Sequence, residues 1–304
     1  MAIQKQLSLF PEIVPLLRPV NVASVPQRSP FRYAGGKTWF VPTFRTWVAS
    51  LKEKPQILIE PFAGGGIISL TALFENLVDR VIMVELDEEV AAVWETILNG
   101  ETDWLAHRIL TFTMTRENIE EELQKMPSSK KERAFQTTLK NRTLHGGILA
   151  EGSRFARYGE RGKGISSRWY PKTLTQRLMN INHIASRIDF RCDDGLNVML
   201  EFADRKNVIY FIDPPYTAGG KNAGRRLYKY HQIDHEHLFR ICSSLSGDFL
   251  MTYSDTKEVQ EMADQHQFQV RSILMKNTHH ATIRELVIGR DLLWLDTDAC
   301  LQQS

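Results

Sequence analysis

Short apolar runs alternate with helical patterns at the start of the folded part of the chain. Residues 56–59 and 81–84 are apolar runs of strand length, and each precedes a turn and then apolar residues at helical spacing. The first turn, residues 61–66, is rich in glycine, and Asp87 stands where the second helix is expected to begin. Strands that alternate with helices in this way predict a parallel sheet covered by helices.

The same alternation returns in the last third of the chain. Strands are predicted at 189–192, 207–212, 249–253 and 286–288. Helices are predicted around Asn197 and from near Asp234. Another helix follows residue 253, with Ser254 or Asp255 as its N-cap. The two halves therefore belong to one α/β architecture.

A different pattern separates these halves. Residues 100–186 show mainly helical spacing, followed by a stretch rich in Gly, Ser and Arg between 144 and 171. We therefore expect one α/β domain, formed by residues 30–99 and 187–304, with a helical insertion at 100–186. Residues 1–29 contain four prolines and no sustained period, which predicts an extended tail.

The composition narrows the class of protein. Of 304 residues, 42% are hydrophobic and 24% are charged, which is ordinary for a globular protein. No apolar run reaches the roughly 20 residues of a membrane-spanning helix, and no secretory signal is expected. The three cysteines lack paired spacing, which indicates free thiols in a reducing compartment. We expect a cytoplasmic protein, and a monomer by default.

Positive charge is concentrated in the insertion. Residues 128–178 hold 12 Lys and Arg against 3 Glu, a net charge of +9 within a chain whose total is +2. The rest of the chain is therefore acidic. This asymmetry favours a surface that binds a polyanion, although a solvated face with clustered charge would show the same pattern.

The glycine-rich turn after the first strand is suited to a nucleotide cofactor. Glycines let a backbone approach a ligand closely, and such cofactors bind at the carboxyl ends of parallel strands. The turn lacks the spacing of dinucleotide and phosphate loops. Glu85, at the end of the second strand, is placed to accept hydrogen bonds from ribose hydroxyls; an ordinary solvated charge is the alternative.

The sharpest signal is Asp213, Pro214, Pro215 and Tyr216 at the end of an apolar strand. Two prolines fix the backbone, so an acid and nearby carbonyls can hold both hydrogens of an aromatic amine and aim its nitrogen at an electrophilic carbon. Tyr216 offers a flat face on which a base can stack. A proline-rich turn alone explains neither the acid nor the aromatic residue.

Together with residues 32–37 (Arg-Tyr-Ala-Gly-Gly-Lys), these two motifs resemble the Dam-type (class alpha, D12) adenine-N6-specific DNA methyltransferases. The motifs occur in the order of that class, and the resemblance spans roughly residues 29–295. It implies a Rossmann-like sheet that binds S-adenosylmethionine, a helical, basic target-recognition insertion, double-stranded DNA as substrate, and base flipping.

The resemblance also implies roles for individual residues. Asp213 through Tyr216 would be catalytic, with Asp213 on the target amine and Tyr216 on the flipped base. The cofactor would contact the following residues: Tyr33, Lys37, Pro61, Phe62, Gly64, Gly66, Glu85, Asp194 and Asp213. Glu85 replaces the usual aspartate, and Gly195 replaces the aromatic residue that often follows Asp194 in the family.

DNA contacts are expected from basic residues of the insertion and of the loop after the catalytic motif. These residues are Arg142, Arg154, Arg157, Arg161, Lys163, Arg168, Lys172, Lys221, Arg225 and Arg226. Lysine and arginine neutralise phosphates, and arginine also reads guanine edges. Trp169 and Tyr170 fit either base stacking or a local core.

A short peptide in the tail suggests a further partner. Gln6, Leu7, Leu9 and Phe10 resemble the peptide by which bacterial replication and repair proteins bind the ring-shaped sliding clamp. Packing of these apolar residues on the protein itself is the alternative. No metal is expected, because the clustered histidines at 231–237 and 279–280 lack a third-ligand pattern.

Other substrates share this chemistry. Cytosine N4, an RNA adenine and a protein glutamine are also planar amines, although the Asp before Pro-Pro-Tyr and the basic insertion favour adenine in DNA. A non-catalytic DNA-binding regulator is a second alternative, and the complete motif set argues against it. The sequence does not indicate the recognition site or whether a restriction nuclease accompanies the enzyme.

Overall fold

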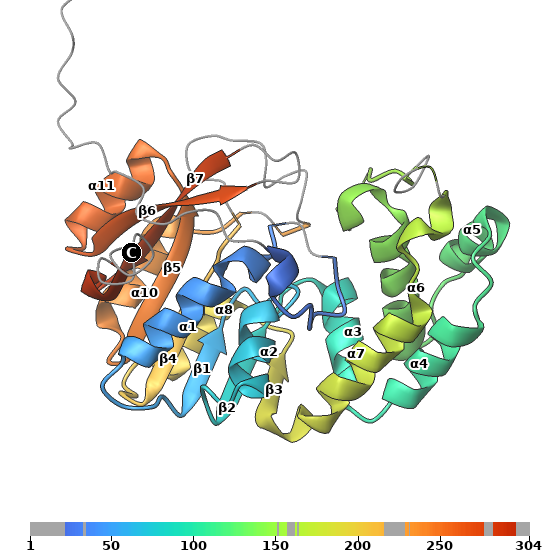
Figure 1. Cartoon of the computed structure of the whole chain (residues 1–304), viewed down its shortest axis with the longest axis horizontal. Coiled ribbons are helices and arrows are strands. Elements are labelled where there is room, and N and C mark those ends of the chain that lie inside the picture. The colour runs from blue at the N-terminus through green and yellow to red at the C-terminus, as the bar shows by residue number, and fades with distance from the viewer. Residues whose placement is uncertain are drawn as a thin grey trace, which may run out of the picture.

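The computed structural model describes residues 22–32, 35–150, 152–156, 162, 164–215, 229–230, 232–276 and 282–295. Seven strands form one sheet in the order β3-β2-β1-β4-β5-β7-β6 (Figure 1). The strands are β1 (Ile57–Glu60), β2 (Arg80–Val84), β3 (Ile188–Arg191), β4 (Val208–Ile212), β5 (Asp248–Ser254), β6 (Gln269–Lys276) and β7 (Thr282–Gly289). The first five are mutually parallel, whereas β7 runs antiparallel between β5 and β6.

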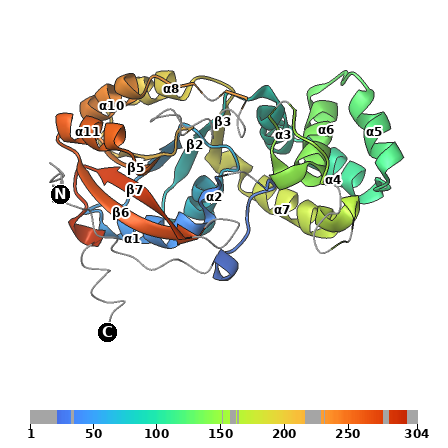
Figure 2. The ribbon, with the colours of Figure 1, turned by 90° about the horizontal axis from the view of Figure 1, so that it is seen from above.

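Helices cover both faces of the sheet, as Figure 2 shows. One face carries α1 (Val41–Ser50) and α2 (Ile67–Phe74), and the other carries α8 (Gly195–Glu201), α10 (His235–Ser244) and α11 (Lys257–Gln265). The buried residues of α3 (Glu88–Leu98) belong to the same core cluster as those of α1 and α2. Successive residues of a strand point to opposite faces of the sheet and so belong to different core clusters. Leu58 and Phe211 pack against α1 to α3, whereas Ile59 and Ile212 pack against α8 to α11. This explains why the central strands β1 and β4 are apolar at every position except Glu60.

In its described residues the insertion contains four α-helices, which stand to one side of the sheet (Figure 1). They are α4 (Thr102–Thr111), α5 (Arg116–Gln124), α6 (Lys130–Thr143) and α7 (Pro171–His183). Short 3-10 turns also occur at Val22–Ser24, Lys37–Phe40, His145–Gly147, Ile165–Arg168 and Ala185–Arg187. None of the helices in the described ranges is long and apolar enough to cross a membrane.

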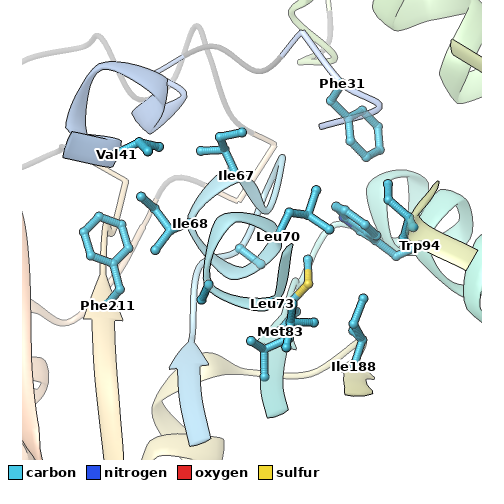
Figure 3. Packing of buried hydrophobic residues seen from close by; sticks show 14 of the residues in the cluster. Phe31, Val41, Ile67, Ile68, Leu70, Leu73, Met83, Trp94, Ile188 and Phe211 are labelled. Carbon is cyan, nitrogen blue, oxygen red and sulfur yellow. The ribbon is translucent and has the colours of Figure 1, made fainter. Parts of the chain in front are cut away.

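Sheet and insertion share one hydrophobic core. Trp94 of α3 is fully buried and belongs to the same cluster as Phe135 of α6 and Leu178 of α7. On its other side Trp94 meets Phe31, with ring centroids 6.0 Å apart (Figure 3). The change in sequence pattern near residue 100 is therefore not a break in packing.

Residues 22–32 form a strap that lies against the body of the protein. Val25 is buried, and Arg28 forms an ion pair with Glu75 at 2.9 Å. Phe31 packs on Trp94. The part of the predicted tail that the structure describes is therefore packed rather than free, and residues 1–21 lie outside the described residues.

Several predicted helix starts are confirmed. The Asp87 side chain accepts a hydrogen bond from Glu89 N and begins α3, and Asp234 accepts one from His237 N and begins α10. The predicted cap of α11 is wrong: Thr256 accepts from Val259 N. Because Ser254 still pairs with Glu285 in the sheet, the cap lies two residues after Ser254 and one after Asp255.

The edge strand β6 was not predicted. Its residues include Arg271 and a buried Ser272, which interrupt the alternation of apolar and polar residues. The strand is held by continuous pairing with β7 from Gln269 to Lys276. Pairing of this kind depends on the partner strand rather than on the local pattern.

Candidate active site

The carboxyl ends of β1, β2, β3 and β4 meet around one pocket of about 500 Å³. Neighbouring parallel strands place their carboxyl ends at the same edge of a sheet, so residues far apart in the chain line this pocket together. Those predicted as site residues are Lys37, Pro61, Phe62, Gly66, Glu85, Asp194, Asp213 and Pro215. Pro214 is buried beside them.

Glu85 is held rigidly at the end of β2. Its carboxylate accepts hydrogen bonds from Gly64 N and Asp87 N, both at 2.9 Å, and Trp94 Nε1 donates to Gly64 O at 2.9 Å. Burial raises the pKa of Glu85 to about 7, although these amide donors oppose the shift. Gly64 therefore acts through its backbone, as the residue that positions Glu85.

Asp194 lines the pocket after the neighbouring strand β3 and begins α8. Its Oδ1 accepts a hydrogen bond from Leu196 N at 2.8 Å, which is an N-cap contact. The following Gly195 lies so close to the turn after β1 that a Cβ atom there would stand 2.2 Å from Pro61 O. The absence of the family's usual aromatic residue at position 195 thus allows a close backbone contact.

The predicted catalytic acid lies at the end of β4 and is held by two donors. Asp213 Oδ1 is 2.9 Å from Lys37 Nζ and accepts a hydrogen bond from Thr252 Oγ1 at 2.8 Å. Lys37 also donates to Gly35 O at 3.1 Å and is only 4% exposed. These contacts fix the carboxylate at the pocket.

Lys37 lies between two carboxylates rather than beside one. Its Nζ is 3.9 Å from Glu285 Oε2 on β7, in addition to the pair with Asp213. Burial lowers the pKa of Lys37, but the two facing carboxylates outweigh it and raise that pKa above its ordinary value. The lysine therefore remains charged inside the protein.

Glu60, the last residue of β1, was not predicted as a site residue. It lines the pocket and is 4% exposed, and its Oε2 accepts hydrogen bonds from Ser69 N at 3.0 Å and Ser69 Oγ at 2.5 Å. Burial raises the pKa of Glu60 to about 8. The sequence feature that could have identified Glu60 as a site residue is its position as an acid at the end of an otherwise apolar strand.

Several predicted site residues lie outside the described residues. They are Tyr33, Tyr216, Arg157, Arg161, Lys163, Lys221, Arg225, Arg226 and the tail residues Gln6, Leu7, Leu9 and Phe10. Further along the loop after the catalytic motif, Lys229 and Tyr230 are described, and both contact Glu88 at 3.0 Å. Within the described ranges, no group of three His, Cys, Asp or Glu side chains could hold a metal ion.

The expectation that Arg142 contacts DNA is wrong. Its side chain is 4% exposed and its Nη2 donates to Pro30 O inside the protein. Burial, together with the nearby charges of Arg177 and Arg32, lowers the pKa of Arg142. The residue is therefore structural, because a phosphate cannot reach it.

Other basic residues of the insertion divide into two sets. Lys130, Lys131 and Lys140 of α6 form ion pairs with acidic residues on or next to α3, at 2.7, 3.1 and 2.6 Å. Arg154 and Lys172 are exposed, and Arg168 is half-buried, with Nη1 3.5 Å from Leu144 O. The positive charge of α6 is thus largely balanced, whereas Arg154 and Lys172 remain at the surface.

The two aromatic residues of the insertion have different environments. Trp169 is buried and lies 6.3 Å from Phe112, ring centroid to centroid, which assigns it to the core. Tyr170 is 53% exposed and begins α7 as its N-cap residue. Of the two, Tyr170 alone is at the surface.

A sheet with parallel strands and a pocket at their carboxyl ends, lined by an acid after β2 and by an Asp-Pro-Pro segment after β4, is the arrangement of an α/β protein that binds a nucleotide cofactor. Residues 33–279 match the family described as D12 class N6 adenine-specific DNA methyltransferase. The chain belongs to this family. It is an adenine-specific DNA methyltransferase with the Rossmann-like sheet of the methyltransferases that use S-adenosylmethionine.

Among solved structures, the chain resembles the rRNA methyltransferase aviRa from Streptomyces viridochromogenes, with 15% identity, a TM-score of 0.40, and coverage of 90% of this chain and 95% of that one. It also resembles an rRNA methylase from Streptococcus thermophilus, with 11% identity, a TM-score of 0.35, and coverage of 83% and 96%. M. capricolum TrmK in complex with S-adenosyl-homocysteine has 9% identity, a TM-score of 0.35, and coverage of 82% and 68%. No curated protein sequence matches the chain.

The residues of the pocket fit S-adenosylmethionine. The volume of about 500 Å³ lies within the range of small-molecule sites. Glu85 offers carboxylate oxygens suited to ribose hydroxyls, and Phe62, Leu86 and Ile233 offer apolar surface to an adenine ring. Asp213 provides a carboxylate suited to the cationic methionine end of the cofactor.

Proposed function

We propose that this protein methylates adenine N6 within double-stranded DNA after the base has left the helix, with Asp213 as the residue that holds the target amine. The observation that carries the proposal is the placement of Asp213 at the pocket, held by Lys37 and Thr252. An exocyclic amine inside a duplex is stacked and paired, so chemistry on it requires the base to be extruded.

In this proposal the chain contributes positioning and charge rather than a covalent bond to the substrate. Asp213 accepts a hydrogen bond from the amino group, which localises the nitrogen lone pair and orients it. The bound cofactor supplies the methyl group. Once the nitrogen has accepted the methyl group it carries one proton too many, and the Asp213 carboxylate that holds the amino group would pass this proton on to solvent. Tyr216 would stack on the extruded base.

The test is methyl transfer to unmethylated plasmid DNA with labelled S-adenosylmethionine, followed by identification of the labelled nucleoside. The wild type is expected to produce N6-methyladenine, and Asp213→Ala to lose at least about a hundredfold in rate, because positioning and electrostatics supply terms of that size. N4-methylcytosine as the product would overturn the choice of base, and label in RNA or protein alone would overturn the choice of substrate.

A matched control separates chemistry from folding. Asp264 of α11 is exposed and is not one of the described residues that line the pocket, so Asp264→Ala removes one carboxylate without touching the pair with Lys37. We expect this variant to keep most of the activity. Calorimetry with S-adenosylhomocysteine on each variant shows whether cofactor binding survives; loss of cofactor binding by the wild type would support the non-catalytic alternative.

The proposed DNA surface consists of Arg154, Arg168 and Lys172 together with Arg157, Arg161 and Lys163. Arg154 and Lys172 are exposed, which supports this assignment. Lys130 and Lys140 of α6 are instead paired with Glu95 and Glu89, so they are less available to phosphates. Lys221, Arg225 and Arg226 follow the catalytic motif directly and are assigned to phosphates near the target base. Arg142 is excluded.

Residues 6–10 are proposed to bind a bacterial sliding clamp. The support is the peptide itself, in which Gln6 and the Leu9-Phe10 pair suit an apolar groove with a polar rim. The protein should be retained on immobilised clamp, and Leu9→Ala with Phe10→Ala should abolish retention without affecting methylation of short DNA. Unchanged retention of that double variant would remove the proposal.

A further inference from the structure

Three backbone carbonyls of the strap accept hydrogen bonds from the insertion. Arg177 Nη1 donates to Ser29 O at 3.0 Å, Arg142 Nη2 donates to Pro30 O, and Asn141 Nδ2 donates to Arg32 O at 2.9 Å. The strap therefore has its backbone satisfied by side chains of α6 and α7 rather than by a neighbouring strand.

Asn141 makes the most complete of these contacts. Its Oδ1 accepts from Arg32 N at 2.9 Å, and its Nδ2 donates to both Arg32 O and Gly147 O, each at 2.9 Å. The side chain is 1% exposed, so water does not compete for these bonds. Asn141 thus joins the strap, α6 and the turn after α6 at one point.

The backbones of Gly147 and Arg32 are in close contact. Gly147 has φ +75°, and a Cβ atom there would stand 2.5 Å from Arg32 O. Phe31, the neighbour of Arg32, is wedged against Trp94 (Figure 3). A shift of the turn at Gly147 therefore has to move Arg32 with it, because close-packed interiors transmit displacement.

Both sides of this junction are walls of the cofactor pocket. Ser29 and Phe31 of the strap line it, and so do residues 147–150, which follow Asn141. Lys37, which holds Asp213, comes five residues after Arg32. On the far side, the chain passes from Ala150 to the exposed Arg154 of the proposed DNA surface.

We infer that Asn141 is a positioning residue through which the occupancy of the DNA surface and of the cofactor pocket influence each other. DNA bound at Arg154 displaces the turn at residues 147–150, which precedes Arg154 in the chain, and the bonds of Asn141 carry that displacement to Arg32 of the strap. The inference rests on the proposed DNA surface. It requires that DNA and cofactor bind more tightly together than separately, by the same factor in either order.

The test is calorimetry with S-adenosylhomocysteine, with and without a saturating fragment of unmethylated plasmid DNA. The wild type is expected to bind the cofactor product about tenfold more tightly when DNA is present, a typical size for coupled sites. Asn141→Ala and the near-isosteric Asn141→Asp, which loses both donated bonds, should reduce this factor to below about twofold. Asn141→Asp should not restore the coupling that Asn141→Ala loses, because its carboxylate would face the carbonyl oxygens of Arg32 and Gly147.

The matched control is Asn118→Ala on α5. Asn118 also donates its side-chain amide to a backbone carbonyl, Thr113 O at 2.9 Å, but at the protein surface and away from the pocket. The Asn118→Ala variant should show the same increase in cofactor affinity with DNA as the wild type.

Thermal melting shows whether the Asn141 variants fold. If they do not, Arg177→Ala is measured in the same way, because Arg177 is half-buried and its loss leaves Ser29 O without that hydrogen bond.

Equal cofactor affinity with and without DNA in the wild type would overturn the inference, as would an unchanged factor in folded Asn141 and Arg177 variants. A wild type that methylates adenine in DNA but shows no such factor contradicts this inference alone. A wild type that does not bind DNA contradicts the proposed function as well.

Discussion

At the scale of single residues, burial decides how the acids of the pocket behave. Glu60 and Asp213 lie at the ends of adjacent strands and both face the pocket, yet their partners differ. Asp213 is paired with a lysine, whereas Glu60 accepts hydrogen bonds from Ser69 and is nearly inaccessible to water. Residue type alone therefore does not indicate which partners a pocket acid has or how far it is buried.

Glu60 should make the stability of the cofactor-free protein depend on pH. Its folded-state pKa of about 8 lies above that of an unfolded glutamate, about 4.3, so between these values the folded protein holds a proton that the unfolded chain has lost. The free energy of unfolding therefore falls as pH rises through this window. Glu60→Gln should remove that fall and be more stable than wild type at pH 8.5 by on the order of 3 kcal/mol.

Urea unfolding at several pH values measures this difference. Glu53→Gln is the matched control, because Glu53 is exposed and the change leaves the pocket untouched. Its stability curve should run parallel to that of the wild type. A Glu60→Gln curve that also runs parallel would show that Glu60 is ionised in the folded protein throughout.

At the scale of elements, α6 and α7 have different roles although both carry basic residues. Lys130 and Lys140 of α6 pair with Glu95 and Glu89 of α3, so these charges hold the insertion against the sheet domain. Lys172, at the start of α7, is exposed. Surface ion pairs contribute little stability individually. They do neutralise the lysines, which are then less attractive to a phosphate backbone.

Salt dependence of DNA binding distinguishes the two helices. Each phosphate contact adds about 0.9 to the slope of log affinity against log salt concentration, so Lys172→Ala should reduce that slope by about 1. Lys140→Ala should leave it unchanged. Fluorescence anisotropy of labelled DNA between about 50 and 200 mM salt gives both slopes. Equal reductions in the two variants would place α6 against DNA.

The elements also differ in how well the sequence predicts them. The central strands and α2, α3 and α10 were predicted because burial on both faces, or an N-cap acid, leaves a local pattern. β6 left no such pattern, since its position at the sheet edge depends on its pairing with β7. The start of α11 was misplaced for the same reason: pairing with β7 extends β5 through Ser254.

At the scale of the whole molecule, the insertion is continuous with the sheet domain. Trp94 contacts the strap on one side and shares a buried cluster with α6 and α7 on the other. The acid-rich surface of α3 and the basic surface of α6 complete the contact. A boundary drawn at residue 100 from the sequence marks a change in local structure, while the core crosses it.

By itself, the sequence determined the α/β class, the family, the cofactor and the main chemical motifs. These follow from residues that are adjacent in the chain, such as Asp213 before two prolines or the glycines after β1, whose local geometry depends little on distant contacts.

Only the tertiary structure decided which charges meet. Lys37 lies between Asp213 and Glu285, Arg142 is buried under the strap, and Glu60 faces the pocket. Each of these facts depends on residues tens to hundreds of positions apart in the sequence. The pKa and the function of a charged side chain depend on its burial and its neighbours in space, which no local pattern encodes.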